Sequence, residues 1–224
     1  MTGQHATSAV AQLHAALTAA DASARLQAAL TAGTHPHSQY VDVLVQRCAL
    51  EPDFSVRDML TWALTRHERT VALDRLLPEL ASAIPQARSQ ALHTLSKIGD
   101  PGAWPAITAA LLRDDDDDVA RAAWRTAAGL APEAARPALA RELASQLGRG
   151  GRDLQRSLSR ALAALGAAAD EVVGEASVAA DSAVRAHGLA TAHLRDHPDD
   201  GFDAAVAHAQ RVVAVRSAPK GQEG

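Results

Sequence analysis

Small and apolar residues recur at a spacing of four along six segments of the chain, which indicates one buried helix face in each segment. Each segment begins at an apolar residue that we call the anchor, and the residues four and eight positions after it are always small or apolar. The six anchors are Ala24, Val56, Ala87, Val119, Leu154 and Val184. Successive anchors are 30 to 35 residues apart. This is about the length of one helical hairpin, so the pattern predicts a structural repeat.

Polar residues around the anchors repeat as well. Four anchors have Asp three positions earlier, where its carboxylate is expected to cap the helix: Asp21, Asp53, Asp116 and Asp181. Four anchors are followed directly by Arg: Arg25, Arg57, Arg88 and Arg185. These residues mark the N-terminus of the second helix of each predicted hairpin.

A further helical run precedes each marked helix. The six runs are Val10–Leu17, Tyr40–Ala49, Leu73–Ala83, Ala103–Arg113, Ala134–Leu147 and Ala169–Ala179. Alternating helices with short links predict an all-α fold, a right-handed α-solenoid of about six hairpins. A helix over Phe202–Val215 is expected to cap the last hairpin. The predicted organisation is one domain over residues 1–216 and a disordered tail over residues 217–224.

Three phrases of the sequence carry a family resemblance: DFSVRDMLTWAL, PQARSQALHTLSKIGDPGAWPAI and DDDVARAAWRTAAGL. They resemble HEAT repeats of the short bacterial kind, also seen in the HEAT-like family of phycobilisome lyases. The phrase around Ala87–Pro101 is also similar to HEAT modules found beside MerR-type regulators. The resemblance covers roughly Asp21 to Leu194 and implies an armadillo-type superhelix. Because the matching residues are structural, it implies little about function.

The composition agrees with close helix packing and excludes some classes of fold and of function. Alanine fills 53 positions and only six residues are aromatic, which excludes a β-sandwich or barrel. The 22 basic and 26 acidic residues give a net charge of −4, so no overall basic excess indicates nucleic acid. The single cysteine, Cys48, excludes an intrachain disulfide and a cysteine-rich zinc site. We expect no signal peptide or membrane span and therefore a cytoplasmic protein.

The second helices of such solenoids line the concave surface, and we expect the positions 1, 2, 5, 6 and 9 after each anchor to face it. These positions hold seven arginines and one acidic residue between Val56 and His193. The hypothesis is a basic groove with two aromatic anchors that binds a protein partner with an acidic surface. Its candidate residues are Arg57, Trp62, Arg88, Arg121, Trp124, Arg125, Arg156, Arg160 and Arg185. An alternative stays open, in which the arginines after the anchors pair with the Asp of the preceding turn and the tryptophans are packed.

Other motifs do not predict chemistry. The run Asp114–Asp118 resembles a calcium loop, but Val119 and Arg125 stand where such a loop needs Gly and Glu. His193 and His197 lack further ligands, so no metal or cofactor is expected. Cys48 is expected to be a small buried hydrophobe.

The sequence predicts a non-catalytic scaffold or adaptor. Alternatives are a nucleic-acid-binding protein or, through Asp58 and Trp62, a HEAT-like lyase or DNA glycosylase.

Overall fold

The computed structural model describes residues 2–197, 202, 205–207, 209 and 212, and these form helices joined by short turns, without a β-strand among them. The first half contains α1 (Thr2–Leu17), α2 (Ala22–Thr34), α3 (Val41–Leu50), α4 (Phe54–Arg66), α5 (Arg69–Leu76), α6 (Pro85–Ile98), α7 (Ala109–Leu112) and α8 (Asp117–Leu130). The second half contains α9 (Arg136–Ala144), α10 (Arg152–Ala164), α11 (Asp170–Ala176) and α12 (Ser182–Asp196). Short 3₁₀ helices at Ser38–Tyr40, Leu77–Ala81, Pro101–Ala106, Glu133–Ala135 and Gly166–Ala169 complete the first helices of the hairpins.

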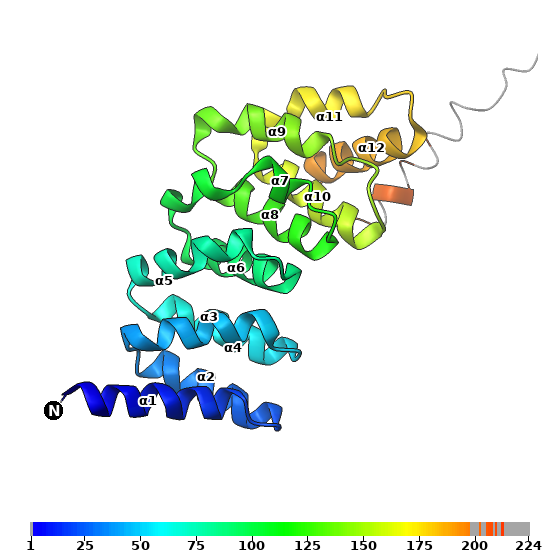
Figure 1. Cartoon of the computed structure of the whole chain (residues 1–224). Coiled ribbons are helices and arrows are strands. Elements are labelled where there is room, and N and C mark those ends of the chain that lie inside the picture. Colours follow the sequence, from blue (N-terminus) through cyan, green and yellow to red (C-terminus); the bar gives the residue numbers. More distant parts are fainter. Residues whose placement is uncertain (1, 198–201, 203–204, 208, 210–211, 213–224) are drawn as a thin grey trace, which may run out of the picture. The chain divides into compact units, whose positions relative to one another are not determined.

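The helices pack in sequence order, which confirms the predicted all-α solenoid. The chain divides into two compact units, residues 1–126 and 127–224, and each is described by itself. In the first unit α2 packs on α4, and α4 packs on α6, so the second helices of successive hairpins are neighbours (Figure 1). In the second unit α10 and α12 pack in the same way. The prediction of one domain over residues 1–216 stays a prediction.

The aspartates that precede the anchors are N-caps, as predicted. Asp53 accepts a hydrogen bond of 3.0 Å from the backbone N–H of Val56. The equivalent acceptors are Asp21, Asp116 and Asp181, with bonds of 3.0, 3.1 and 2.9 Å to the N–H of Ala24, Val119 and Val184. Each cap satisfies an N–H that has no partner within the helix and so starts the second helix at a defined residue.

Small residues allow the close packing that the composition indicates. Gly33 of α2 lies directly beneath the indole of Trp62 on α4, because a Cβ atom added to Gly33 would stand 2.4 Å from Trp62 Cζ3. Gly188 of α12 lies equally close to the backbone of α11, where an added Cβ would be 2.7 Å from the carbonyl carbon of Ala176. Both contacts leave no room for a side chain.

The predicted capping helix over residues 202–215 is described at six positions, all of them helical. Phe202, Ala205, Val206 and Ala209 form a buried cluster with Ala190 of α12. The ring of Phe202 also meets His187 edge-on, with centroids 6.4 Å apart. The tail predicted over residues 217–224 lies outside the described residues.

Candidate functional site

A cavity of about 720 Å³ lies along the N-terminal parts of α4, α6 and α8, entirely within the first unit. We call it the three-helix cavity. It is lined by Phe54, Arg57, Asp58, Pro85, Gln86, Ser89, Gln90, His93, Asp116, Asp118, Arg121, Ala122 and Arg125. Most of its polar side chains occupy positions 1, 2 and 6 after the anchors, so the helical register brings them onto one surface.

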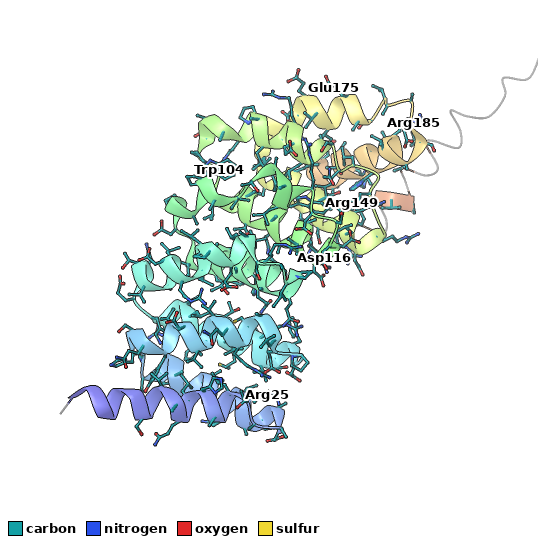
Figure 2. The ribbon with its side chains drawn as sticks, viewed as in Figure 1. Arg25, Trp104, Asp116, Arg149, Glu175 and Arg185 are labelled. Atoms are coloured by element: carbon teal, nitrogen blue, oxygen red, sulfur yellow. The ribbon has the colours of Figure 1, made fainter. Side chains whose placement is uncertain are left out.

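Three of the predicted arginines, Arg57, Arg121 and Arg125, line this cavity. The expected excess of positive charge is not found there, because Asp58, Asp116 and Asp118 line it too. Asp116 lies in the turn before α8 and Asp118 in the first turn of that helix (Figure 2 labels Asp116). Neither residue is among the positions after the anchors from which the basic groove was predicted. The cavity therefore has a balanced charge, which corrects the prediction of a basic groove at this place.

Three successive second helices are connected across the cavity by Asp58, His93 and Arg125. Arg125 Nη2 donates to His93 Nδ1 at 3.0 Å, so Nδ1 is the unprotonated nitrogen of the ring. The other ring nitrogen, Nε2, lies 4.0 Å from Asp58 Oδ1. Burial lowers the pKa of His93, and the positive charges of Arg125 and Lys97 lower that pKa further, against a smaller opposite effect of Asp58. His93 is therefore neutral near pH 7.

Arg125 is an exposed cation that meets His93 but no carboxylate within ion-pair distance among the residues that the structure describes. Burial and the charge of Arg121, one helical turn away, lower the pKa of Arg125. Arg121 itself pairs with Asp118. The α8 side of the cavity thus holds two neighbouring guanidinium groups, of which one is neutralised.

Arg57 lies on the opposite side of the cavity and is held by its own repeat. Its Nη1 donates to the carbonyl oxygens of Glu51 and Pro52 at 2.8 and 2.7 Å. Its guanidinium carbon lies 5.9 Å from the ring centre of Phe54. Phe54 begins α4 and is 74% exposed, so it presents an apolar surface at this edge.

The arginines after the anchors share one structural role. The sequence left open whether they pair with the Asp of the preceding turn or face a binding partner. Each donates from Nη1 to the carbonyl oxygen six residues earlier: Arg25 to Ala19, Arg57 to Glu51, Arg88 to Ser82 and Arg185 to Ala179. Their partners are carbonyls of the preceding turn, not the N-capping Asp. Arg88 also binds Asp114. Arg88 and Arg185 therefore serve the fold and lie outside the cavity lining.

The prediction for Trp124 is wrong. Its side chain is fully buried (0% exposed), and Nε1 donates to the carbonyl of Leu112 at 2.7 Å. Position 5 after an anchor is about 140° around the helix from it, and in α4 this side faces the neighbouring second helix, because Thr61 Oγ1 lies 3.3 Å from Thr94 Oγ1 of α6. Thr61, Leu92 and Ser159 at the same position are also buried. Trp62, at position 6, is 38% exposed but packs on Gly33 and does not line the cavity.

The two remaining candidates, Arg156 and Arg160, belong to α10 in the second unit. Arg156 Nη1 lies 3.7 Å from Asp153 Oδ1, and its guanidinium lies over the ring of Phe202 at 5.8 Å. Arg160 is exposed. Neither lines the three-helix cavity.

Sequence reasoning did not single out Phe54, Gln86 or Gln90. His93 stands at position 6 after Ala87, so the sequence places it on the expected face, but it was not among the candidate binding residues. Phe54 precedes its anchor by two residues, outside the positions expected to face a ligand. Gln86 is held by bonds of 2.9 Å from its Nε2 to the carbonyls of Cys48 and Glu51.

Other candidate chemistry is limited in the described part of the chain. No group of three or more His, Cys, Asp or Glu residues there is arranged to hold a metal ion. Burial raises the pKa of Cys48 to about 12, so its thiol is not ionised near neutral pH. None of the described helices has the length and apolar character needed to cross a membrane.

The family comparison matches the same part of the chain that carries the cavity. Residues 49–129, from the end of α3 to α8, match the HEAT repeats. All residues that line the three-helix cavity lie within this segment. The resemblance predicted from the sequence is confirmed for this segment. A search of the curated proteins finds no match.

Two solved structures are similar to the chain at low sequence identity. Human deoxyhypusine hydroxylase in complex with glycerol has 15% identity and a TM-score of 0.46, covering 96% of this chain and 97% of that one. A chain from the complex of CpcE and CpcF of phycocyanin lyase from Nostoc sp. PCC7120 has 19% identity and a TM-score of 0.39, covering 91% and 94%.

Proposed function

We propose that the protein is a non-catalytic adaptor whose three-helix cavity binds an extended segment of another protein. The observation that carries this proposal is the cavity itself, in which three successive second helices present apolar, amide and charged side chains to one space. Repeat arrays recognise partners through such surfaces, formed by equivalent positions of neighbouring repeats. A regulatory setting, as the likeness to MerR-associated modules suggested, belongs to the same proposal.

The state of His93 supports binding over catalysis. A general base needs a free lone pair directed at the substrate. Nδ1 of His93 already accepts from Arg125, and the protonated Nε2 faces Asp58. The imidazole in this arrangement positions its neighbours and has no lone pair to accept a proton.

The charge of the cavity supports a protein partner over nucleic acid. A phosphate backbone is bound by surfaces on which positive charges prevail. Three aspartates stand among three arginines here, so a polyanion along the cavity would meet repulsion as well as attraction. A protein segment with mixed polar and apolar side chains matches the lining better.

The test is a selection of random peptides on the full-length protein. A displayed library of peptides about twelve residues long is long enough to cross three helices in an extended conformation. Enriched peptides are synthesised with a fluorophore, and their affinity is measured by polarisation for the wild type and for Phe54→Ala. We expect Phe54→Ala to weaken binding about tenfold or more.

Val178→Ala is the matched control, because Val178 is another exposed apolar residue (72% exposed) outside the cavity. It should leave the affinity unchanged. A selection without enrichment, or peptides that bind Phe54→Ala as tightly as the wild type, would overturn the proposal. Labelled single-stranded and duplex DNA are titrated in parallel between about 50 and 200 mM salt, and a steep loss of binding with salt would favour the nucleic-acid alternative.

A further inference from the structure

We propose that Arg125 is the carboxylate-binding residue of the three-helix cavity, and that the bound segment places an Asp or Glu side chain on it and an apolar side chain on Phe54. This inference rests on the proposed function and specifies the partner. It assigns opposite ends of the cavity to two different groups of the ligand. It therefore predicts a sequence pattern, and not only an affinity.

Arg125 has N–H donors that no carboxylate of the described residues meets. A guanidinium carries five N–H donors in a planar fork that matches a carboxylate. The contact with His93 occupies one amino group, Nη2. Among the described residues no carboxylate meets the other donors, although Arg125 lines a cavity. A ligand carboxylate would complete this set of bonds.

The charges on α8 favour an anionic group beside Arg125. Arg121 and Arg125 are four residues apart on one face of α8, an arrangement in which like charges repel. Asp118 compensates Arg121, so one positive charge of the pair has no carboxylate to balance it. An anionic side chain of the bound segment would offset the repulsion between Arg121 and Arg125, and a cationic side chain would increase it.

His93 orients the guanidinium of Arg125. His93 accepts from Arg125 only while Nδ1 carries no proton, and the nearby Asp58 favours the tautomer with the proton on Nε2. The imidazole thereby holds the guanidinium from the α6 side. A fixed guanidinium loses less entropy when it binds a carboxylate than a free one does.

Phe54 provides the apolar surface at the other end of the cavity. Phe54 is exposed at the start of α4, and Arg57 packs over its ring. From α4 to α8 there are two steps between neighbouring helices, each of about 8–10 Å. An extended peptide advances about 3.3 Å per residue, so the acidic and apolar residues of the ligand should be about five or six positions apart.

The experiment uses the peptides selected on the wild-type protein. We expect Asp or Glu to be enriched about five or six positions from an apolar residue. Replacing that acid by its amide should weaken binding to the wild type about tenfold or more. Binding to Arg125→Gln should be equally weak for the acidic and the amide peptide, so that the two changes are not additive.

Arg160→Gln is the control, because Arg160 is an exposed arginine at the same register position of α10. It should bind the acidic peptide as the wild type does. If the peptides depend on Phe54 but bind equally well as acid and amide, this inference fails and the adaptor function stands. If no peptide is enriched, both proposals fail.

Discussion

Arg25 binds the carboxylate of Glu51 through two hydrogen bonds of 2.8 Å, and this pair joins α2 to the turn that follows α3. Glu51 is fully buried (0% exposed) and also accepts from Arg47 and from the N–H of Asp53. Arg88 repeats the arrangement with Asp114, again 26 residues further along the chain. Two of the predicted hairpins are therefore tied to the next one by an arginine that also closes its own turn.

The first prediction is that Glu51→Gln destabilises the protein by about 3–5 kcal/mol, because it leaves buried positive charge without compensation. The free energy of unfolding in urea, followed by circular dichroism, measures the loss. Asp74→Asn, which changes an exposed carboxylate of α5, should stay within about 0.5 kcal/mol of the wild type. A loss below about 1 kcal/mol for Glu51→Gln would show that the pair contributes little.

The same carboxylate predicts acid sensitivity. Burial alone would raise the pKa of Glu51, but hydrogen bonds from Arg25, Asp53 N–H and Arg47 outweigh it and lower the pKa to about 2. A lowered carboxyl pKa contributes stability above its unfolded value near 4.5, and this contribution is lost as the pH falls towards 2. The difference in unfolding free energy between the wild type and Glu51→Gln should therefore shrink steadily as the pH falls from about 4.5 towards 2.

The third prediction concerns His187 of the second unit. It accepts from the N–H of Gly148 through Nδ1 at 3.1 Å, and Nε2 lies 3.0 Å from the carbonyl of Gln155. Burial lowers the pKa of His187 to about 4. Because the unfolded chain takes up the proton near pH 6.5, stability should fall by up to about 3 kcal/mol between pH 6.5 and 4.

Urea unfolding across this pH range tests the third prediction, together with an NMR titration of the His187 ring. In His187→Gln the part of the pH dependence that comes from this residue should vanish, while that of the other nine histidines remains. A His187 ring that titrates near pH 6.5 in the folded protein would contradict the assignment.

The fourth prediction compares two helical glycines of the second unit. A Cβ at Gly188 would lie 2.7 Å from a backbone atom of α11, whereas one at Gly174 meets nothing within 4 Å. Gly188→Ala should therefore cost about 1–3 kcal/mol through overpacking, and Gly174→Ala should gain up to about 1 kcal/mol through helix propensity. Thermal unfolding measures both, and similar shifts for the two variants would contradict the close helix approach.

The fifth prediction concerns Cys48, whose side chain is buried and whose pKa is raised to about 12 by that burial. The native protein should not react with a thiol-specific disulfide reagent at about pH 8, and the urea-unfolded protein should release one equivalent. Rapid modification of the folded protein would mean that the thiol is accessible.

The repeat and its helix starts could be read from the sequence, because both depend on local spacing. The anchors recur in a fixed relation to Asp21, Asp53, Asp116 and Asp181, and the structure places these four residues as N-caps. A capping bond spans only three residues. A capping bond therefore depends only on residues at the start of one helix and not on the elements against which that helix packs.

The candidate site could be predicted only in part. Helical period shows which residues share a face, and so Arg57, Arg121 and Arg125 were found together. Period does not show which flank of a helix its neighbours cover, and for this reason Trp124 was expected at the surface, although its side chain is fully buried and bonds to the Leu112 carbonyl of α7. Nor does it include the turn before α8 or the first residues of that helix, from which Asp116 and Asp118 bring negative charge into the cavity.

The sequence by itself thus determined the all-α repeat, the length of each hairpin and the residues at which the second helices begin, because these follow from local spacing and capping. Only the tertiary structure decided that the arginines after the anchors bind turn carbonyls and that Asp58, His93 and Arg125 meet across three helices. Residues about 32 positions apart come into contact through the stacking of whole hairpins. The rotation of one hairpin against the next sets those contacts.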